Sequence, residues 1–152
     1  MTEPVVRIQR EDFDTGAETA KITAGRRDLG AVVTFSGLCR DEGGRLAMLE
    51  LEHYPGMAQA EIERIARQAA ARWPVDAITV IHRFGRIAPG ENIVLVATAS
   101  AHRQAAFDAA SFIMDFLKSN APFWKKEHRA DGRGGDWVEA KEADERSMDR
   151  WR

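Results

Sequence analysis

Two long amphipathic segments, each preceded by strand-like segments, constrain the fold of this chain more than any other feature. In residues 57–73 and 103–120, apolar side chains recur at the spacing of a helix, and charged side chains lie away from them. The apolar positions are Ala58, Ile62, Ile65, Ala66, Ala69 and Trp73 in the first segment, and Ala106, Ala110, Ile113 and Leu117 in the second, with Phe112 and Phe116 on its flank. A proline follows each segment and is expected to end the helix, because proline cannot continue the hydrogen-bond pattern.

Short runs of alternating or β-branched apolar residues predict strands around these helices. They cover residues 5–9, 30–37, 46–53, 77–87, 92–100, 123–128 and 137–140. A shorter helix is expected at residues 15–24, capped by Asp14. The Pro-Gly turn at residues 88–91 favours antiparallel pairing of the strands on either side. This order predicts an α+β fold with an antiparallel or mixed sheet and two long helices.

Length and composition narrow the class of protein. The 152 residues predict a single domain over residues 1–152, with residues 1–10 and 141–152 at its periphery. A formal net charge of −2 argues against a nucleic-acid partner. The one cysteine, Cys39, permits no internal disulfide, and no Cys/His spacing typical of a metal site occurs, so we expect no metal and no cofactor. We also expect a cytoplasmic protein without a membrane segment, because residues 1–12 lack the apolar stretch of a signal peptide and no apolar run reaches about 18 residues.

Basic and titratable residues gather at the ends of the second long helix and predict a pocket for an anionic small molecule. His102 and Arg103 start the helix, where free backbone N–H groups and the helix dipole favour anions. Lys118 lies near its end, and Lys125 and Lys126 follow in the next strand, where only one of them can face a pocket. Each also has a plain structural interpretation, as a polar strand end, a solvated arginine or a lysine that complements the helix dipole.

Two further residues lie in the loop that follows residues 30–37. Arg40 is at a strand end, where functional residues often occur, although a solvated loop arginine is the commoner case. Cys39 has no histidine near it in sequence, and we assign it no role.

Nine sequence fragments, in this order, resemble the large, catalytic subunit of molybdopterin synthase. They are GAVVTFSG, the arginine loop after it, LELEHYPGM, RWP, VIHRFG, SAHR, FIMDFLK, APFWKKE and WVEA, and they extend from about residue 30 to residue 140. The resemblance implies an α/β hammerhead-type fold. It also implies a homodimer at the centre of a heterotetramer, in which each large subunit binds a small ubiquitin-like sulfur carrier.

The resemblance further implies a sulfurtransferase of molybdenum cofactor biosynthesis. The carrier's C-terminal Gly-Gly tail, as a thiocarboxylate, would donate sulfur to cyclic pyranopterin monophosphate (precursor Z), and two transfers would form the dithiolene of molybdopterin. A phosphorylated pterin needs cationic groups, and cations can stabilise the charged intermediates of acyl transfer. Since the sulfur arrives on the carrier, no cysteine nucleophile is required here.

The family's functional residues carry over to matching positions of this chain. Lys118 is the first expectation for catalysis and Lys125 the second. Arg40, His102 and Arg103 are expected to bind the phosphate or stabilise developing charge, and Met114 and Glu127 to line or order the pocket. Lys141 stands where the family often has arginine, and a neighbouring subunit would contribute this residue. The loop at Cys39 also departs from the family pattern.

Two other functions remain as alternatives. A non-catalytic module that holds an anionic metabolite or the carrier's tail would keep the arginines and tolerate loss of Lys118. An RNA-binding α+β domain would use the basic segment 118–133, although the net charge argues against it.

Overall fold

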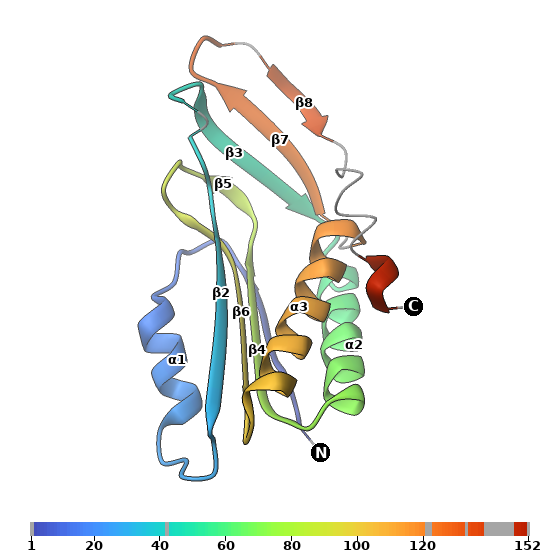
Figure 1. Cartoon of the computed structure of the whole chain (residues 1–152). Helices are drawn as coiled ribbons and strands as arrows, with labels where there is room; N and C mark the ends of the chain where they lie inside the picture. Colours follow the sequence, from blue (N-terminus) through green and yellow to red (C-terminus); the bar gives the residue numbers. More distant parts are fainter. Residues whose placement is uncertain (1, 42, 121–122, 133, 139–147, 152) are drawn as a thin grey trace.

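The computed structural model describes residues 2–41, 43–120, 123–132, 134–138 and 148–151. Its elements follow the predicted alternation of strands and helices (Figure 1). They are β1 (Val5–Gln9), α1 (Thr15–Thr23), β2 (Ala31–Leu38), β3 (Leu46–His53), α2 (Met57–Arg72), β4 (Val75–Arg83), β5 (Gly85–Ile87), β6 (Asn92–Ser100), α3 (Arg103–Ser119), β7 (Phe123–Arg129), β8 (Gly134–Val138) and a 3₁₀ turn η1 (Met148–Trp151).

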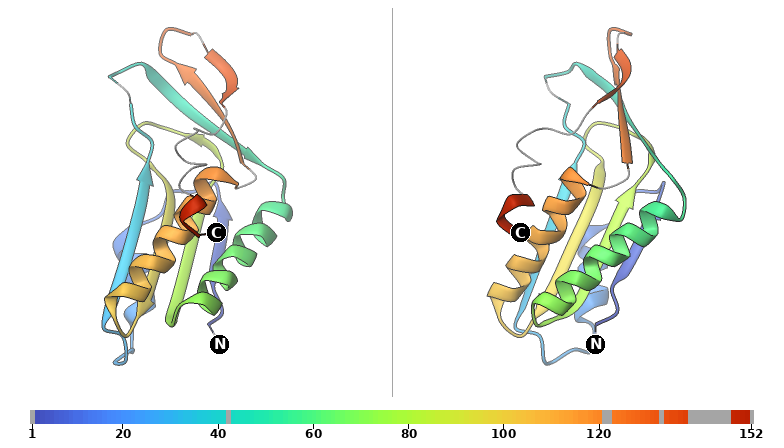
Figure 2. Two further views of the ribbon diagram at one scale, coloured as in Figure 1. Left: turned by 45° about the vertical axis from the view of Figure 1, so that its right-hand side comes forward. Right: turned by 90° about the vertical axis from the view of Figure 1, so that its right-hand side faces the viewer.

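The first sheet has the strand order β1-β4-β6-β2. Strand β1 pairs with β4 in parallel, and the other neighbours are antiparallel, so the sheet is mixed, and the expected pairing across the Pro-Gly turn is confirmed for β4 and β6. Helices α2 and α3 cover one face of this sheet and α1 packs on the other (Figures 1 and 2). The N-terminal residues, expected at the periphery, form the edge strand β1.

The second sheet is antiparallel, with the order β5-β3-β7-β8, and lies beyond the upper end of the first sheet (Figure 1). The chain enters it from β2 into β3, from β4 into β5 and from α3 into β7. The end of α3 is therefore brought to the junction between the two sheets. The predicted α+β fold class with two long helices is confirmed.

One predicted strand is wrong in its extent. Residues 77–87 were expected to form one strand, but the chain changes sheets at Phe84, so that β4 lies in the first sheet and β5 in the second. Gly85 has φ +82°, which favours glycine, and a Cβ there would lie 2.9 Å from Nη1 of Arg10. The spacing of apolar residues cannot predict this local backbone conformation.

Strand β8 also begins earlier than expected. It starts at Gly134, three residues before the predicted start at residue 137, and pairs with β7. Residues 139 and 140, which were predicted to extend this strand, lie outside the described residues.

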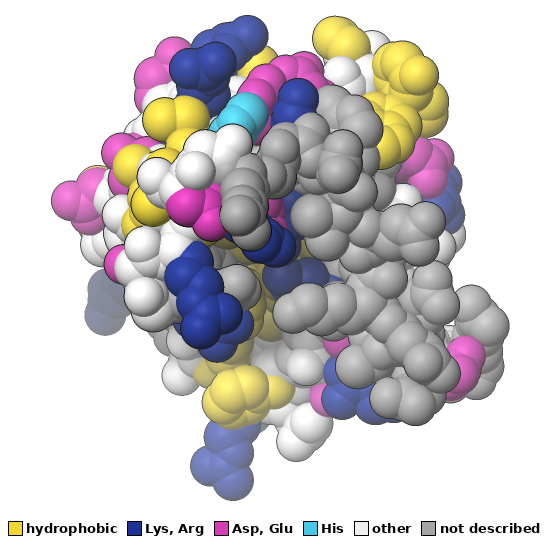
Figure 3. Space-filling view, turned by 90° about the horizontal axis from the view of Figure 1, so that it is seen from above, with side chains coloured by type: hydrophobic (Ala, Val, Ile, Leu, Met, Phe, Trp, Pro, Cys, Tyr) yellow, Lys and Arg dark blue, Asp and Glu magenta, His cyan; other side chains and the backbone are white. Residues whose placement is uncertain are grey.

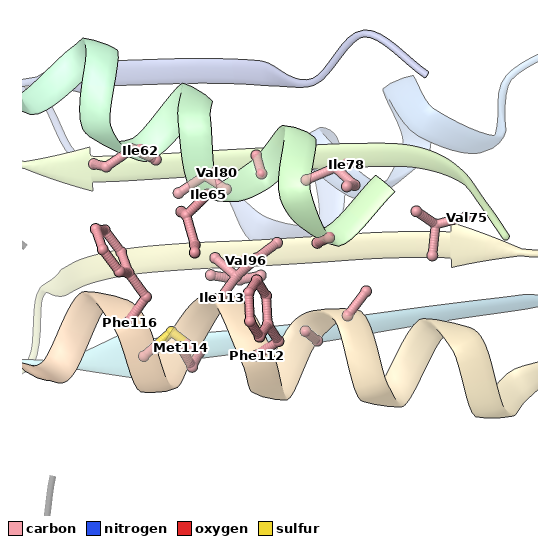
Figure 4. Close-up of a cluster of buried hydrophobic side chains, with 14 of the residues drawn as sticks. Ile62, Ile65, Val75, Ile78, Val80, Val96, Phe112, Ile113, Met114 and Phe116 are labelled. Carbon is pink, nitrogen blue, oxygen red and sulfur yellow. The ribbon is translucent and has the colours of Figure 1, made fainter. Parts of the chain in front are cut away.

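The main core lies between the first sheet and the pair α2 and α3 (Figure 4). Ile62 of α2 and Ile113 of α3 belong to the two predicted apolar stripes, and both are fully buried. Phe112 and Phe116 were expected on the flank of α3, but they are only 5% and 4% exposed. They are buried because η1 and α2 cover that flank, where the ring of Trp151 lies 5.6 Å from that of Phe112.

Candidate active site

A stack of aromatic rings joins the two sheets where α3 ends. The rings of His82, at the end of β4, and Phe123, at the start of β7, are parallel within 13° at a centroid distance of 3.8 Å. His53 of β3 pairs with Phe123 across the second sheet and packs against Phe84 at 4.4 Å. This stack ties the start of β7 to the end of β4, and so positions the lysines that follow Phe123.

His82 is neutral in this environment. Its side chain is only 7% exposed, and Nδ1 lies 2.9 Å from the carbonyl oxygen of Arg83. Since a carbonyl only accepts, Nδ1 carries the proton and Nε2 does not. Burial lowers the pKa of His82 from 6.5 to about 4, and the positive charge of Lys118 acts in the same direction. This electrostatic effect places Lys118 within range of the aromatic stack.

Lys118 is exposed in the last turn of α3. A lysine in this turn complements the negative end of the helix dipole. Met114 lies one turn earlier on the same side of the helix and is buried in the core. Lys118 is therefore held on a helix, at the end of α3 that leads to the second sheet.

Lys125 and Glu127 lie on the inner face of the second sheet. They pair with Leu51 and Leu49, which pack around the buried Cys39. Nζ of Lys125 is 3.7 Å from a carboxylate oxygen of Glu127. Burial raises the pKa of the Cys39 thiol, and the charge of Lys125 offsets this only in part, so Cys39 is a protonated thiol at neutral pH.

Lys126 lies on the other face of the same strand, as the alternation predicted. It pairs with Glu50, which also accepts a hydrogen bond from the imidazole of His128 at 2.9 Å. Of the two adjacent lysines, Lys125 is therefore the one that faces the junction.

Arg40 reaches the same end of the molecule by another path. It directly follows Cys39 after the upper end of β2, and its side chain is exposed. Seen from above, several Lys and Arg side chains are visible at this end of the molecule (Figure 3).

His102 and Arg103 lie at the opposite end of α3. His102 is the N-cap residue, Arg103 opens the helix, and both are exposed. With a rise of about 1.5 Å per residue, Arg103 and Lys118 are about 22 Å apart along the helix. The sequence predicted one pocket from these groups, but within one chain the structure separates them, because α3 is a straight element of 17 residues.

The other predicted site residue, Lys141, lies outside the described residues. Glu127 lines a small pocket of about 100 Å³ together with Arg45, Leu46 and Arg129. Two larger hollows, of about 500 and 490 Å³, lie between α2, α3 and η1 and between α1 and the β1–β4 edge. None of these three pockets is lined by Lys118, Lys125 or Arg40.

The sequence reasoning did not single out His82, His53 and Arg83, which the structure brings to the junction. A detectable signal was present, since His82 and Arg83 interrupt an otherwise apolar strand pattern. A buried arginine in such a strand needs acceptors, and Arg10, Glu91 and Asn92 supply those of Arg83.

The structure is thus that of a two-sheet α+β domain with lysines and an arginine near the junction of its sheets. The sequence model of the family described as MoaE protein matches residues 8–120. The chain belongs to the MoaE family, as the sequence fragments predicted.

Relatives and solved structures agree with this assignment. The chain is 69% identical over 149 residues to the molybdopterin synthase catalytic subunit of Mesorhizobium japonicum, covering 98% of this chain and 94% of the relative. It superposes on the molybdopterin biosynthesis MoaE protein of Burkholderia ambifaria with a TM-score of 0.83, at 44% identity and 97% coverage of both chains. For molybdopterin synthase from Staphylococcus aureus the TM-score is 0.77, at 30% identity and with coverage of 88% of this chain and 96% of that one. None of the helices in the described part of the chain has the length and apolar character needed to span a bilayer.

Proposed function

We propose that this chain is the catalytic subunit of a molybdopterin synthase. It transfers sulfur from the C-terminal thiocarboxylate of a small ubiquitin-like carrier to precursor Z, and so forms the dithiolene of molybdopterin. The observation that carries the proposal is the 69% identity to a relative of that name over nearly the full length of both chains. The name itself, catalytic subunit, implies a second kind of subunit.

The proposed reaction centre is the junction at the end of α3, with Lys118 as the leading catalytic group. In each transfer the carrier's sulfur forms a bond to a pterin carbon, and a carbon–oxygen bond of the pterin breaks as its oxygen leaves. Water then attacks the acyl carbon, the acyl carbon–sulfur bond breaks, and the carrier is released with a plain carboxylate. The acyl intermediates are anionic, and an ammonium group within reach stabilises them or moves protons. Lys125 is the second cation, and Glu127, at 3.7 Å, orients it.

The proposed carrier would cover the junction, and the sulfur that it brings removes the need for a nucleophilic thiol in this chain. An extended Gly-Gly tail spans about 7 Å, so the body of the carrier must cover the surface around Lys118 and Lys125. The bound carrier would exclude water from the centre and strengthen its electrostatic interactions. Cys39 is buried with a raised pKa, which agrees with sulfur that arrives on the partner.

A homodimer accounts for the position of His102 and Arg103. These residues are too far from Lys118 to contact the same small substrate within one chain, since α3 separates them by about 22 Å. In the proposed assembly they bind the phosphate of a substrate that the partner protomer converts. Arg40 and Met114 complete the pocket beside Lys118, and Lys141 is contributed by a neighbouring protomer. The proposed compartment is the cytoplasm.

Reconstitution tests the proposed function. The purified protein is mixed with precursor Z and a ubiquitin-like carrier in its thiocarboxylate form, and the dithiolene product is assayed. We expect product only with the thiocarboxylate, and none with the carrier as a plain carboxylate. Measurable carrier binding without any product would refute the enzyme and favour the non-catalytic binding module.

A further inference from the structure

Arg83 is a buried cation that none of the proposed catalytic steps uses. It is 5% exposed at the end of β4. Its Nε donates to the carbonyl oxygen of Arg10 and its Nη1 to that of Asn92, both at 2.9 Å. Nη1 also lies 3.4 Å from a carboxylate oxygen of Glu91. A guanidinium is buried in proteins only where several acceptors surround it, so this position is specific for arginine.

Glu91 connects Arg83 to the turn between β5 and β6. The same carboxylate oxygen accepts a hydrogen bond from the backbone N–H of Ala88 at 2.9 Å. The N–H of Glu91 donates back to the carbonyl of Ala88 at 3.1 Å, and Gly90 has φ +91°, as a Pro-Gly turn of this kind requires. The ion pair therefore fixes the conformation of the turn at both of its ends.

The 88–91 turn is hydrogen-bonded to the loop that carries Arg40. The N–H of Cys39 donates to the carbonyl of Glu91 at 2.8 Å, and the N–H of Gly90 donates to the carbonyl of Cys39 at 2.7 Å. Both backbone groups of Cys39 are thus bound to the turn, and the side chain of Cys39 is buried beneath it. Arg40 is the next residue, so the direction in which its backbone leaves the sheet depends on this pair of hydrogen bonds.

We infer that Arg83 and Glu91 are positioning residues for substrate binding, acting through the 88–91 turn and Cys39 on Arg40. The inference rests on the proposed function, in which Arg40 contacts the phosphorylated pterin. Neither Arg83 nor Glu91 contacts the substrate. Their contribution is to hold one cation of the site in the orientation that binding requires, and loss of this order weakens binding of the phosphorylated substrate more than it slows turnover.

Glu91→Ala is the sharpest variant for a test. The Glu91 side chain is 42% exposed, and Arg83 keeps its two backbone acceptors without it, so the protein is expected to fold. Glu61→Ala is a matched control, because Glu61 is 39% exposed, is also paired with an arginine, and lies on α2 away from the loop. We expect Glu91→Ala to raise the KM for precursor Z by about tenfold with little change in kcat, and Glu61→Ala to leave both unchanged.

A double-variant cycle and hydrogen exchange separate positioning from a general loss of stability. In an Arg40→Ala background, Glu91→Ala is expected to add less than about a twofold change in KM, because the group it positions is gone. Amide exchange at Cys39 and Arg40 is expected to be faster in Glu91→Ala than in Glu61→Ala. An unchanged KM in active Glu91→Ala protein, or fully additive losses in the double variant, would overturn the inference.

The exchange measurement does not depend on activity. If the wild-type protein made no product, the proposed function would fail. Exchange at Cys39 and Arg40 that is no faster in Glu91→Ala than in Glu61→Ala would overturn the positioning of this loop, whether or not the protein is active. Arg83→Lys provides a second variant, since a lysine retains the charge but lacks the planar guanidinium whose Nε and Nη1 donate to Arg10 and Asn92. It is expected to reproduce the rise in KM, and a normal KM in this variant would contradict the role of Arg83.

Discussion

Arg103 and Lys118 lie in the first and last turns of the same helix, about 22 Å apart along its axis. Both were expected at one site, and a pterin monophosphate is too small to contact the two within one chain. The stacked rings of His82 and Phe123 hold the start of β7, the strand that follows α3, against the end of β4. The two ends of this helix can serve one reaction only if two protomers contribute one end each.

Mixing two inactive variants tests this arrangement. Arg103→Ala should bind precursor Z weakly, and Lys118→Ala should lack turnover. If each site takes Lys118 from one protomer and Arg103 from the other, a mixed dimer contains one intact site. Coexpression of the two chains should therefore restore about a quarter of the wild-type rate. Coexpression of Lys118→Ala with an Arg103→Ala/Lys118→Ala double variant is the control without recovery. If the mixed dimers show no recovery, Arg103 and Lys118 from different protomers do not contribute to the same site.

Lys118→Ala should reduce the rate of dithiolene formation by about 100-fold or more, because it removes the leading cation of the proposed centre. The free energy of unfolding should change by less than about 0.5 kcal/mol, since the side chain is exposed. Carrier binding should remain. Lys21→Ala, which removes an exposed lysine from the last turn of α1, is the control and should be fully active. Near-normal turnover of Lys118→Ala would exclude this lysine as the catalytic group.

Lys125→Ala and Lys126→Ala compare adjacent lysines on opposite faces of β7. Removal of Lys125, which faces the junction beside Glu127, should slow the reaction by about tenfold or more. Removal of Lys126, which faces Glu50, should have little effect on the rate. Steady-state assays with saturating carrier make the comparison, and equal effects of the two variants would argue against a specific role for Lys125.

Stability should decrease as the pH falls from 6.5 toward 4, because His82 is buried in its neutral form. Its pKa is about 4 in the folded protein and 6.5 when unfolded, so the unfolded chain binds more protons in this range. The contribution of His82 to the free energy of unfolding is fully present above pH 6.5 and amounts to about 3 kcal/mol. About 2 kcal/mol of it is lost by about pH 5.

Urea unfolding at pH 7 and pH 5 measures this effect. In His82→Phe, which retains a ring to stack on Phe123, the stability difference between the two pH values should shrink by about 2 kcal/mol. His102→Gln replaces an exposed histidine and should behave like the wild type. An unchanged pH dependence in His82→Phe would mean that His82 titrates normally in the folded protein.

Local sequence patterns predicted most of the elements. The apolar stripes of α2 and α3 and the cap at Asp14, whose carboxylate accepts a hydrogen bond from the N–H of Ala17 at 2.9 Å, are readable because each depends on residues within one or two turns. The alternation in β7 also separated Lys125 from Lys126 correctly. The family resemblance supplied the reaction, which no residue pattern here specifies.

The sequence by itself determined the helices, most strands and the α+β class, because these follow from residue spacing. It also predicted the residue types of the proposed anion site from side-chain chemistry. Only the tertiary structure decided which of those residues meet. It divided residues 77–87 between two sheets at Gly85 and buried His82 under Phe123. It also paired Arg83 with Glu91, whose turn is hydrogen-bonded to Cys39 in the loop that carries Arg40. These relationships join segments far apart in the chain, and their free energy comes from packing and hydrogen bonds that form only when the two sheets come together.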